Sequence, residues 1–293
     1  MTLSSVVAAP SQFYLWQGHR IAYTVQGQGE PLLLIHGFGA CWQHWRKNIP
    51  VLAAAGYRVY ALDLLGFGAS DKPLLDYGLE LWRAQIEAFW QSHIQRPMVM
   101  VGNSIGGLLT LLILRTSPQQ VRAGVLLNCA GGLNHRPDEL HFPLNWVMGA
   151  FTRLVTGETW GPWLFNQIRQ KKRIRNTLYQ IYGDRQAVTD ELVEMLYQPS
   201  CHENAQKVFA SILAAPAGPA PAQLLPHIET PLLVIWGEKD PWTPLSGAKI
   251  YQQRAQSRGD TEFYTLPQAG HCPQDDAPQA VNELLLGWLG RLA

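Results

Sequence analysis

The feature that most constrains the fold is a set of short, largely apolar segments that alternate with helical stretches. Three of them have the length and the Val, Ile and Leu content of strands buried on both faces: "PLLLIHG" (31–37), "YRVYALDL" (57–64) and "PMVMVGNS" (97–104). Before the third, "LELWRAQIEAFWQSHI" (79–94) places apolar residues three and four positions apart, as on one face of a helix. Strands that alternate with helices predict an α/β fold, with a mostly parallel central sheet and helices on both faces.

The order of the segments also predicts where this pattern is interrupted. A hairpin at 13–27 precedes the buried strands, and a fourth buried strand, "GVLLNCA", covers 124–130. No buried-strand run follows until Pro226, and three segments there predict helices: "PLNWVMGAFTRLV" (143–155), "WLFNQIRQKKRIRNTLYQIYG" (163–183) and "TDELVEMLYQ" (189–198). Strands then resume with "PLLVIWG" (231–237) and "TEFYTLP" (261–267), before a final helix at 277–292. We expect a core of residues 1–130 and 227–293, with residues 131–226 inserted as a helical lid.

The composition excludes several classes of function. Hydrophobic residues make up 47% of the 293 residues and charged residues 15%, so the chain can bury a large core. The formal net charge of +1 gives no electrostatic reason to expect a nucleic-acid partner. The four cysteines are too widely spaced for a disulfide framework, and no ligand cluster predicts a metal or a cofactor. Because we find no secretory leader and no run of about 18 apolar residues, we expect a soluble, cytoplasmic protein. The oligomeric state is left open.

The stretch "VGNSIGG" (101–107) places one hydroxyl, that of Ser104, where a buried strand meets a helix. Gly102 and Gly106 flank it and leave room for a sharp turn. This Gly-x-Ser-x-Gly arrangement is typical of a nucleophile at the C-terminal edge of a parallel sheet, with a helix N-terminus behind it. Small residues also crowd strand-to-helix turns that have no catalytic role, so the interpretation depends on finding partners for the serine.

The C-terminal third of the chain supplies such partners. A serine hydroxyl needs a base to take its proton, and a histidine base needs an acid to orient it. His271 follows the last strand in "LPQAGHCPQDDAP", and Asp240 follows the preceding strand in "WGEKDPWTP". The chain order Ser104, Asp240, His271, with each residue just after a strand, is typical of one large class of hydrolases. After the first buried strand, the "HGFGA" loop (36–40) supplies the backbone N–H of Phe38. Together with that of Ile105 we expect it to form an oxyanion hole.

These motifs carry a resemblance to a known family. From about Phe13 to the C-terminus the sequence is similar to the α/β-hydrolase superfamily, through "HGFG", "ALDLLGFGASDKP", "GNSIGG", "WGEKDPW" and "AGHCPQDDAP". Within it, the sequence resembles pheophytinase and chlorophyll-dephytylase-like hydrolases of plants and cyanobacteria, through "LWRAQIEAFW", "GNSIGG", "LLN", "DPW" and "GHCP" with an acidic pair. The resemblance implies Ser104 as nucleophile, His271 as base and Asp240 as orienting acid. It also implies a bulky lipophilic ester as substrate, such as the phytyl ester of chlorophyll or pheophytin.

Other functions stay open beside this one. The "GNSxGG" form also occurs in carbon–carbon bond hydrolases of the meta-cleavage-product type, and the insertion is shorter than in the plant pattern and matches it poorly. A generic short-chain carboxylesterase and a binding protein that keeps the pocket are further alternatives. Because the nucleophile position is Ser104 and not an aspartate, the aspartyl-ester chemistry of haloalkane dehalogenases and epoxide hydrolases is disfavoured.

Several residues near the motifs invite a catalytic interpretation that we do not favour. Asp275 and Asp276 could rival Asp240, but they follow the histidine so closely that we expect them to cap the final helix. Asp63, at the end of a strand, is expected to hold its loop. We expect His36 to shape the oxyanion loop rather than to act as a base. Cys272 does not lie in a nucleophile turn and is expected to pack as a small apolar side chain.

The insertion is expected to bind the substrate and to contact a membrane. Aromatic side chains commonly wall lipophilic ligand sites, and core packing is the alternative for each of them; the candidates are Trp146, Trp160, Trp163 and Trp242. The basic run "RQKKRIR" (169–175) is either a solvated helix face or a contact with an anionic membrane surface, such as the thylakoid. In the second case "FPLNWVMGAF" (142–151) would supply the apolar contact.

Overall fold

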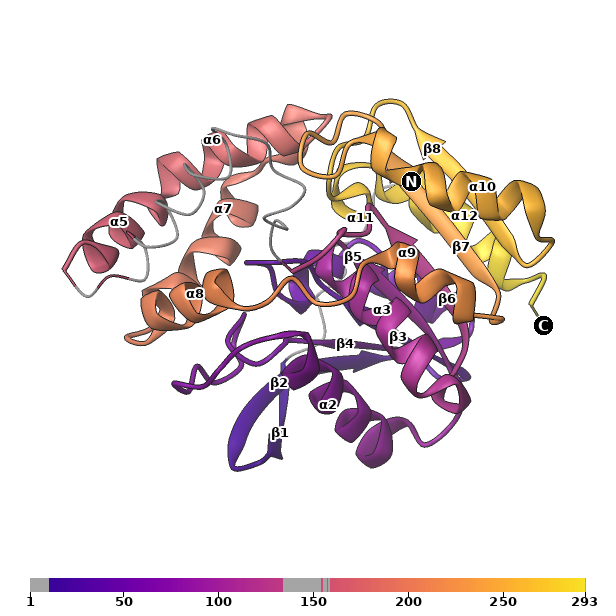
Figure 1. The fold of residues 1–293 in the computed structure, drawn as a ribbon, viewed down its shortest axis with the longest axis horizontal. Helices are drawn as coiled ribbons and strands as arrows, with labels where there is room; N and C mark the ends of the chain where they lie inside the picture. Colours follow the sequence, from indigo (N-terminus) through magenta and orange to yellow (C-terminus); the bar gives the residue numbers. More distant parts are fainter. Residues whose placement is uncertain (1–10, 134–153, 155–156, 158, 293) are drawn as a thin grey trace.

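The computed structural model describes residues 11–133, 154, 157 and 159–292 (Figure 1). Its centre is a sheet of eight strands in the order β1-β2-β4-β3-β5-β6-β7-β8. The strands are β1 (Gln12–Trp16), β2 (His19–Gln26), β3 (Glu30–Ile35), β4 (Tyr57–Leu62), β5 (Met98–Asn103), β6 (Val121–Leu127), β7 (Leu232–Gly237) and β8 (Thr261–Leu266). β1 and β2 form an antiparallel hairpin and β2 pairs antiparallel with β4, whereas all the other neighbours are parallel. The predicted α/β class and the mostly parallel sheet are confirmed.

Helices cover both faces of this sheet. Those outside the insertion are α1 (Ile49–Ala54), α2 (Leu79–Phe89), α3 (Ile105–Thr116), α10 (Lys249–Ser257), α11 (Pro273–Asp276) and α12 (Pro278–Leu289). On one face Leu33 and Ile35 of β3 pack with residues of α2, α3 and α10. On the other face Leu32 and Leu34 pack with residues of α1 and α12. Successive side chains of a strand point to opposite faces. Burial on both faces therefore explains why these strands are continuous apolar runs.

Between β6 and β7 the described residues form helices and short turns, with no strand. The α-helices are α5 (Gly161–Ile168), α6 (Lys171–Ile181), α7 (Asp190–Tyr197), α8 (Ala205–Ala214) and α9 (Pro221–Leu224). The single helix predicted over 163–183 is wrong, because the extended backbone of Gln170, with ψ of 132°, separates α5 from α6. The helix predicted over 189–198 is present as α7, whose N-cap Thr189 accepts a hydrogen bond from the N–H of Leu192. The helix predicted over 143–155 lies outside the described residues, apart from Leu154.

The sheet brings the ends of four strands together at one edge. β5, β6, β7 and β8 run parallel, so the residues that follow them leave the sheet on the same side. Ser104 follows β5, the helical insertion follows β6, Asp240 follows β7 and His271 follows β8. Figure 1 shows α5, α6, α7 and α8 gathered on one side of the molecule, away from α10 and α12. Within the described ranges, no helix is long and apolar enough to cross a bilayer.

Candidate active site

Ser104 occupies a strained turn between β5 and α3. Its backbone φ is +55°, a conformation that costs a residue other than glycine roughly 1–3 kcal/mol. The Ser104 N–H donates to the Leu127 carbonyl at 3.0 Å, and the Ala130 N–H donates to the Ser104 carbonyl at 3.1 Å. Gly106 allows the close approach behind the turn, because a Cβ there would lie 2.3 Å from the Ile35 carbonyl oxygen. The surrounding backbone thus holds Ser104 in a conformation that presents its hydroxyl at the sheet edge.

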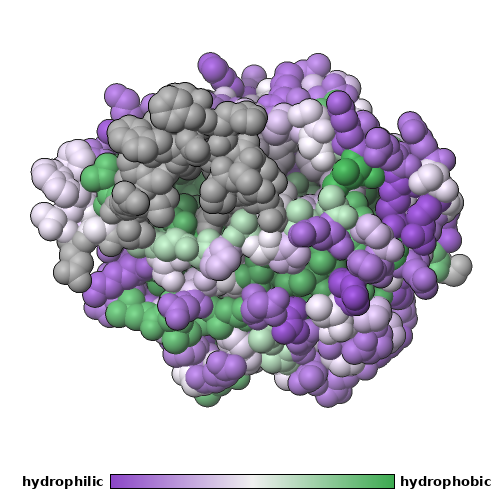
Figure 2. Space-filling model, viewed as in Figure 1, coloured by the Kyte–Doolittle hydropathy of each residue, from purple (hydrophilic) through white to green (hydrophobic). Residues whose placement is uncertain are grey.

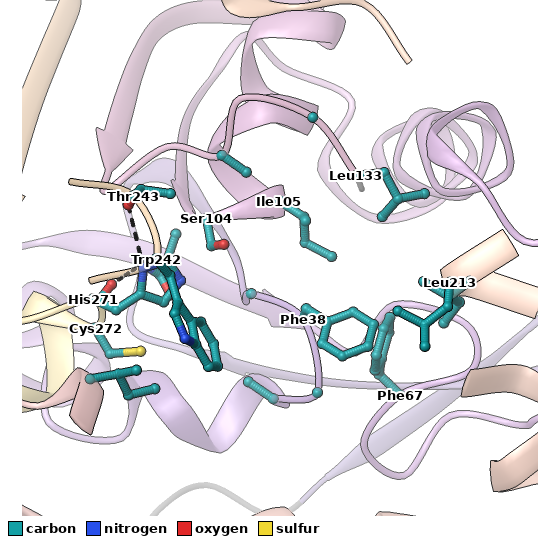
Figure 3. Close-up of a pocket in the computed structure, with 18 of the residues that line it drawn as sticks. Phe38, Phe67, Ser104, Ile105, Leu133, Leu213, Trp242, Thr243, His271 and Cys272 are labelled. Atoms are coloured by element: carbon teal, nitrogen blue, oxygen red, sulfur yellow. Dashed lines mark hydrogen bonds between the residues drawn. The ribbon is translucent and has the colours of Figure 1, made fainter. Parts of the chain in front are cut away.

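His271 and Asp240 form a buried pair beside this turn. Nδ1 of His271 lies 2.6 Å from Oδ2 of Asp240. An ionised carboxylate only accepts hydrogen bonds, so the shared proton lies on Nδ1, and Nε2 is the ring nitrogen that can accept another proton. Figure 3 shows His271 and Ser104 at the same end of a cavity. The sheet therefore brings together the three side chains that the sequence predicts as nucleophile, base and acid.

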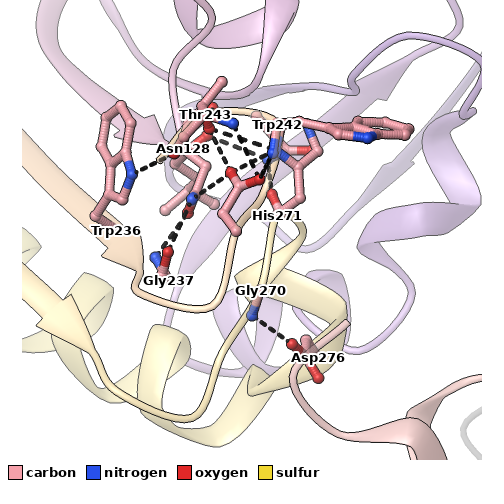
Figure 4. Close-up of polar contacts among 11 residues, drawn as sticks. Asn128, Trp236, Gly237, Trp242, Thr243, Gly270, His271 and Asp276 are labelled. Carbon is pink, nitrogen blue, oxygen red and sulfur yellow. Dashed lines mark hydrogen bonds and ion pairs between the residues drawn. The ribbon is translucent and has the colours of Figure 1, made fainter. Parts of the chain in front are cut away.

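Two further residues hold Asp240, and the sequence analysis missed both (Figure 4). Nδ2 of Asn128 donates to Oδ2 of Asp240 at 2.7 Å, and the Thr243 hydroxyl donates to the same oxygen. The backbone N–H groups of Trp242 and Thr243 donate to Oδ1 at 2.7 and 3.0 Å. Burial raises the pKa of Asp240, but the hydrogen bonds from His271 and Thr243 outweigh burial and hold that pKa below its ordinary value. Asp240 is therefore ionised and fixed in orientation.

The loop after β3 brings the backbone of Phe38 close to the serine. A Cβ on Gly37 would lie 3.2 Å from the Cβ of Ser104, so the two segments are almost in contact. Ile105 is the first residue of α3, where a backbone N–H has no acceptor in its own helix. Neither this N–H nor that of Phe38 donates to a carbonyl within the described residues. Both groups are available to the oxygen of a bound substrate, as the predicted oxyanion hole requires.

His36 supports this loop from within. Its Nε2 accepts a hydrogen bond from the N–H of Leu64 at 3.1 Å, so Nδ1 carries the proton and donates to the Gly37 carbonyl at 2.7 Å. Burial lowers the pKa of His36 to about 4. The side chain is therefore neutral at physiological pH and shapes the loop, as the sequence predicts.

Ser104 and His271 line a cavity of about 1390 Å³ between the sheet edge and the insertion. This volume exceeds the roughly 300–1,000 Å³ of ordinary small-molecule sites. Apolar side chains from both sides supply much of its wall, among them Phe38, Phe67, Leu133, Phe165, Leu178, Val208, Phe209 and Leu213. Figure 3 shows Phe38 and Phe67 side by side, with Leu213 beyond them. In Figure 2 apolar side chains also form a band across the middle of the molecular face, below the grey residues.

The cationic side chains at the cavity are already engaged with the protein. Lys72 and Arg169 are the Lys and Arg residues among the described lining residues. The Lys72 ammonium donates to the carbonyls of Gly68 and Ser70 at 2.8 and 3.1 Å. The Arg169 guanidinium donates to Oδ1 of Asn166 at 2.7 Å. These bonds hold the two cations in place, and the rest of the wall, which is mainly apolar, suits a large apolar molecule.

Residues 32–284 match the alpha/beta hydrolase family. The chain belongs to this family. It is 28% identical over 301 residues to pheophytinase of the chloroplast from Arabidopsis thaliana, which covers 89% of this chain and 61% of that protein. The chain therefore spans less than two thirds of that relative. It is also 33% identical over 262 residues to 2-hydroxymuconate semialdehyde hydrolase from Pseudomonas sp. strain CF600, covering 85% of this chain and 82% of the relative.

A solved structure of similar fold supports the same family assignment. A meta-cleavage product hydrolase from Pseudomonas fluorescens IP01 superposes with a TM-score of 0.76 at 26% identity. The superposition covers 96% of this chain and 98% of that one. The resemblance to α/β hydrolases that the sequence indicates is confirmed.

The structure places the predicted aromatic substrate contacts differently from one another. Trp242 lines the cavity, is 51% exposed, and contacts the His271 ring edge-on at 5.2 Å between centroids. Trp160 and Trp163 are 61% and 58% exposed, and the structure does not place them among the described residues that line the cavity. On α5 the inward positions are taken by Phe165 and Ile168, which leaves the two tryptophans on the outer side. Trp146 lies outside the described residues.

Asp276 links the His271 loop of the hydrolase to the insertion instead of capping the final helix. Its Oδ2 accepts the N–H groups of Gly270 and Gly183, both at 2.7 Å, and its Oδ1 accepts that of Asp184 at 3.0 Å. The N–H of His271 itself donates to the Ile181 carbonyl at 2.7 Å. The predicted cap is wrong because α12 has no side-chain cap bond, whereas the turn after α6 offers two donors to Asp276 and the His271 loop offers a third. We call residues 181–184 and 270–276 together the clamp.

Asp275 forms a second part of the clamp. Its Oδ2 accepts a hydrogen bond from the Tyr182 hydroxyl at 2.9 Å, and its Oδ1 lies 2.9 and 3.0 Å from the cationic groups of Arg46 and Lys47. Nε2 of His44, which also lines the cavity, lies 2.8 Å from the Tyr182 hydroxyl. Burial lowers the pKa of His44 to about 4, although the Asp275 carboxylate opposes this. Asp275 is thus a structural anion, and the Asp240 carboxylate is the one that holds His271.

The other residues that invited a catalytic interpretation are structural in this hydrolase. Asp63 accepts hydrogen bonds from the N–H groups of Trp42 and Ala69 at 2.6 and 2.7 Å. Burial raises the pKa of Asp63 to about 7, although these two bonds oppose the shift. Cys272 packs with Leu178 in a small apolar core formed mainly by residues of the insertion, and burial raises the pKa of its thiol. Among the described residues, no group of three or more His, Cys, Asp or Glu side chains is arranged to hold a metal ion.

Proposed function

We propose that this protein is a serine hydrolase that cleaves a carboxylic ester of a bulky lipophilic substrate. The observation that carries the proposal is the strained Ser104 beside the His271–Asp240 pair, at one end of a large and mainly apolar cavity. Acyl transfer needs a hydroxyl, a histidine base oriented by an acid, and donors for the oxyanion. Here His271 is hydrogen-bonded to Asp240, and the N–H groups of Phe38 and Ile105 have no carbonyl acceptor among the described residues.

In the first step, Oγ of Ser104 attacks the ester carbonyl while Nε2 of His271 takes its proton. The carbonyl oxygen becomes an oxyanion that accepts hydrogen bonds from the N–H groups of Phe38 and Ile105. The imidazolium, stabilised by Asp240, then returns the proton to the leaving alcohol as the tetrahedral intermediate collapses to the acyl-enzyme. In the second step, His271 deprotonates a water molecule that attacks the acyl-enzyme and releases the acid.

The substrate class follows from the cavity and from a relative. A mainly apolar cavity of about 1390 Å³ accommodates a bulky ester, and the similarity to the Arabidopsis pheophytinase suggests a phytylated pigment, pheophytin or chlorophyll. A carbon–carbon bond hydrolase is the second candidate, because the chain is 33% identical to 2-hydroxymuconate semialdehyde hydrolase. The mainly apolar wall of the cavity favours the ester, and the Lys72 ammonium is held by the carbonyls of Gly68 and Ser70.

The experiment is a chromatographic assay of purified protein with pheophytin, with chlorophyll, with a short synthetic ester and with a vinylogous diketone. Ser104→Ala is the control, and a serine-directed phosphonate reports on the nucleophile directly. Release of a dephytylated pigment by the wild type alone supports the proposal in full. Cleavage of the short ester without the pigments would overturn the substrate class. Cleavage of the diketone alone would replace ester hydrolysis by carbon–carbon cleavage, and absence of phosphonate labelling would indicate a binding protein.

A further inference from the structure

The outer side of α5 and α6 carries the features of a membrane-docking surface. The segment from Gly161 to Ile181 contains five Lys and Arg residues and no Asp or Glu, in a chain whose formal net charge is only +1. Figure 1 shows α5 and α6 following each other along one edge of the molecule. The cations are therefore concentrated locally rather than spread over the whole surface.

Two exposed cations of this segment make no ion pair within the described residues. Lys171 pairs with Glu194 at 2.5 Å, and Arg175 pairs with Asp190. Lys172 lies between them and is exposed, as is Arg173. For these last two, the part of the chain that the structure describes contains no acidic partner. Each retains its full charge for a surface outside the protein.

The aromatic pair at the start of α5 adds apolar contact to these cations. The rings of Trp160 and Trp163 meet edge to face, with 6.3 Å between their centroids, and more than half of each side chain is exposed. Tryptophan combines a large apolar ring with one N–H donor and is enriched where bilayers meet water. Exposed tryptophans and exposed lysine and arginine on one helical segment are typical of helices that lie on anionic lipid surfaces.

The inner side of the same two helices explains what such docking would achieve. Phe165 and Ile168 of α5 and Ile174 and Leu178 of α6 line the cavity. One layer of helix, roughly 10 Å thick, separates the outer surface from the cavity. A lipophilic molecule at this surface would lie one helix layer away from the cavity that Ser104 lines.

We propose that Trp160, Trp163, Lys172 and Arg173 form a docking surface for an anionic lipid bilayer, from which the hydrolase takes its substrate. The docking itself stands on the exposed rings and unpaired cations, whereas delivery of an ester rests on the proposed function. The charge complementarity commits the surface to anionic headgroups, and the aromatic pair inserts at the level of those headgroups.

The test is sedimentation of the full chain with vesicles of phosphatidylcholine alone or mixed with phosphatidylglycerol. The wild type should bind the mixed vesicles, with affinity that falls as salt rises. Because each basic residue near an anionic surface contributes about fivefold in affinity, the double variant Lys172→Gln/Arg173→Gln should bind roughly 25-fold more weakly. The double variant Trp160→Ala/Trp163→Ala should lose about tenfold or more. Intrinsic tryptophan fluorescence should shift to the blue on binding in the wild type.

Matched controls come from other parts of the surface. Arg115→Gln/Lys249→Gln removes two exposed cations from α3 and α10, and Phe13→Ala/Leu15→Ala removes two exposed apolar side chains from β1. Both control pairs should bind like the wild type. Equal loss in the control and test pairs would overturn the proposal, as would wild-type binding that does not distinguish the two kinds of vesicle. A dimer that the tryptophan double variant dissociates, without vesicle binding, would instead assign this surface to a second copy of the chain.

The binding result is independent of hydrolysis. None of the four residues of the docking surface contacts Ser104, Asp240 or His271, so cleavage of a short soluble ester should be unchanged in both test variants. If the wild type binds anionic vesicles but cleaves no ester, the proposed function fails and the docking surface stands. If it cleaves esters but does not bind, the docking surface fails alone.

Discussion

Replacement of Asp276 by asparagine tests whether the clamp positions the base. Asp276 accepts three backbone N–H groups, two from the turn after α6 and one from Gly270, which immediately precedes His271. An asparagine keeps one acceptor oxygen but turns an NH₂ group toward backbone donors. The substitution therefore preserves the shape of the side chain while it removes up to two of the three hydrogen bonds.

The magnitude follows from these bonds. A hydrogen bond to a charged group contributes about 1.5–3 kcal/mol, and losing two leaves buried donors without partners, so we expect the free energy of unfolding to fall by roughly 3–5 kcal/mol. For a chain of this size that corresponds to a Tm lower by roughly 10 °C. Because His271 donates its own N–H to Ile181 within the clamp, we also expect the imidazole to shift. A misplacement of about 1 Å lowers turnover by roughly a hundredfold.

The assay combines thermal unfolding, followed by circular dichroism, with steady-state kinetics on a short ester. Below the lowered Tm, Asp276→Asn should show kcat reduced by roughly ten- to a hundredfold and KM within about twofold, because Asp276 does not line the cavity. The rate of phosphonate labelling should fall in parallel. Asp76→Asn, an exposed carboxylate outside the clamp, is the matched control and should change neither quantity. A variant with wild-type Tm and wild-type kcat would refute the reasoning.

Three further predictions concern other parts of the site. Asn128→Ala removes a donor to Asp240, so kcat should fall about tenfold with little change in KM, and an unchanged kcat would mean that the other donors suffice. Burial lowers the pKa of His44 from the ordinary 6.5 to about 4, so between these pH values the unfolded chain binds a proton at His44 and the folded chain does not. As pH falls through this range, His44 should lower the free energy of unfolding by about 1.4 kcal/mol per pH unit. Thermal unfolding of His44→Gln, measured at several pH values, should lack this contribution. Gly102→Ala would place a Cβ 2.0 Å from a backbone carbonyl oxygen and should abolish soluble, active protein, whereas Gly259→Ala, with open space around it, should behave like the wild type.

The sequence predicts the sheet well because its strands have both faces buried. The strand Met98–Asn103 is buried along its whole length, so its sequence is a nearly continuous apolar run. Such a short apolar run without helical periodicity indicates a strand that is buried on both faces. The ends of these strands then locate Ser104, Asp240 and His271 by topology alone. The split between α5 and α6 is not visible in this way, because Gln170 is an ordinary helix former and only its backbone angles interrupt the helix.

The supports of the site could not be predicted because their partners are remote in sequence. Asn128 lies 112 positions before Asp240, and Asp276 lies 93 positions after Gly183. Nothing local distinguishes Asp276 from a helix-capping residue, since both roles place a carboxylate just before a helix. Thr243 is the exception, because a hydroxyl three residues after Asp240 fits a local turn and could have been noted. The orientation of Trp163 could not be predicted because the short helix α5 carries large apolar residues on two sides. Only the position of the cavity shows that Phe165 and Ile168 face inward and Trp163 faces outward.

The clamp attaches one part of the insertion, residues 181–184, to the His271 loop. Gly183 and Gly270 touch each other's segments so closely that a Cβ on either would lie within 2 Å of a backbone oxygen, so this contact cannot slide. The insertion therefore cannot swing away from the sheet as one rigid body without carrying the His271 loop with it. A chimaera that replaces the insertion of this protein would have to keep the turn 181–184, because this turn contacts the His271 loop. Exposed residues before it on α5 and α6 can be replaced without touching this contact, whereas the turn itself belongs structurally with the His271 loop.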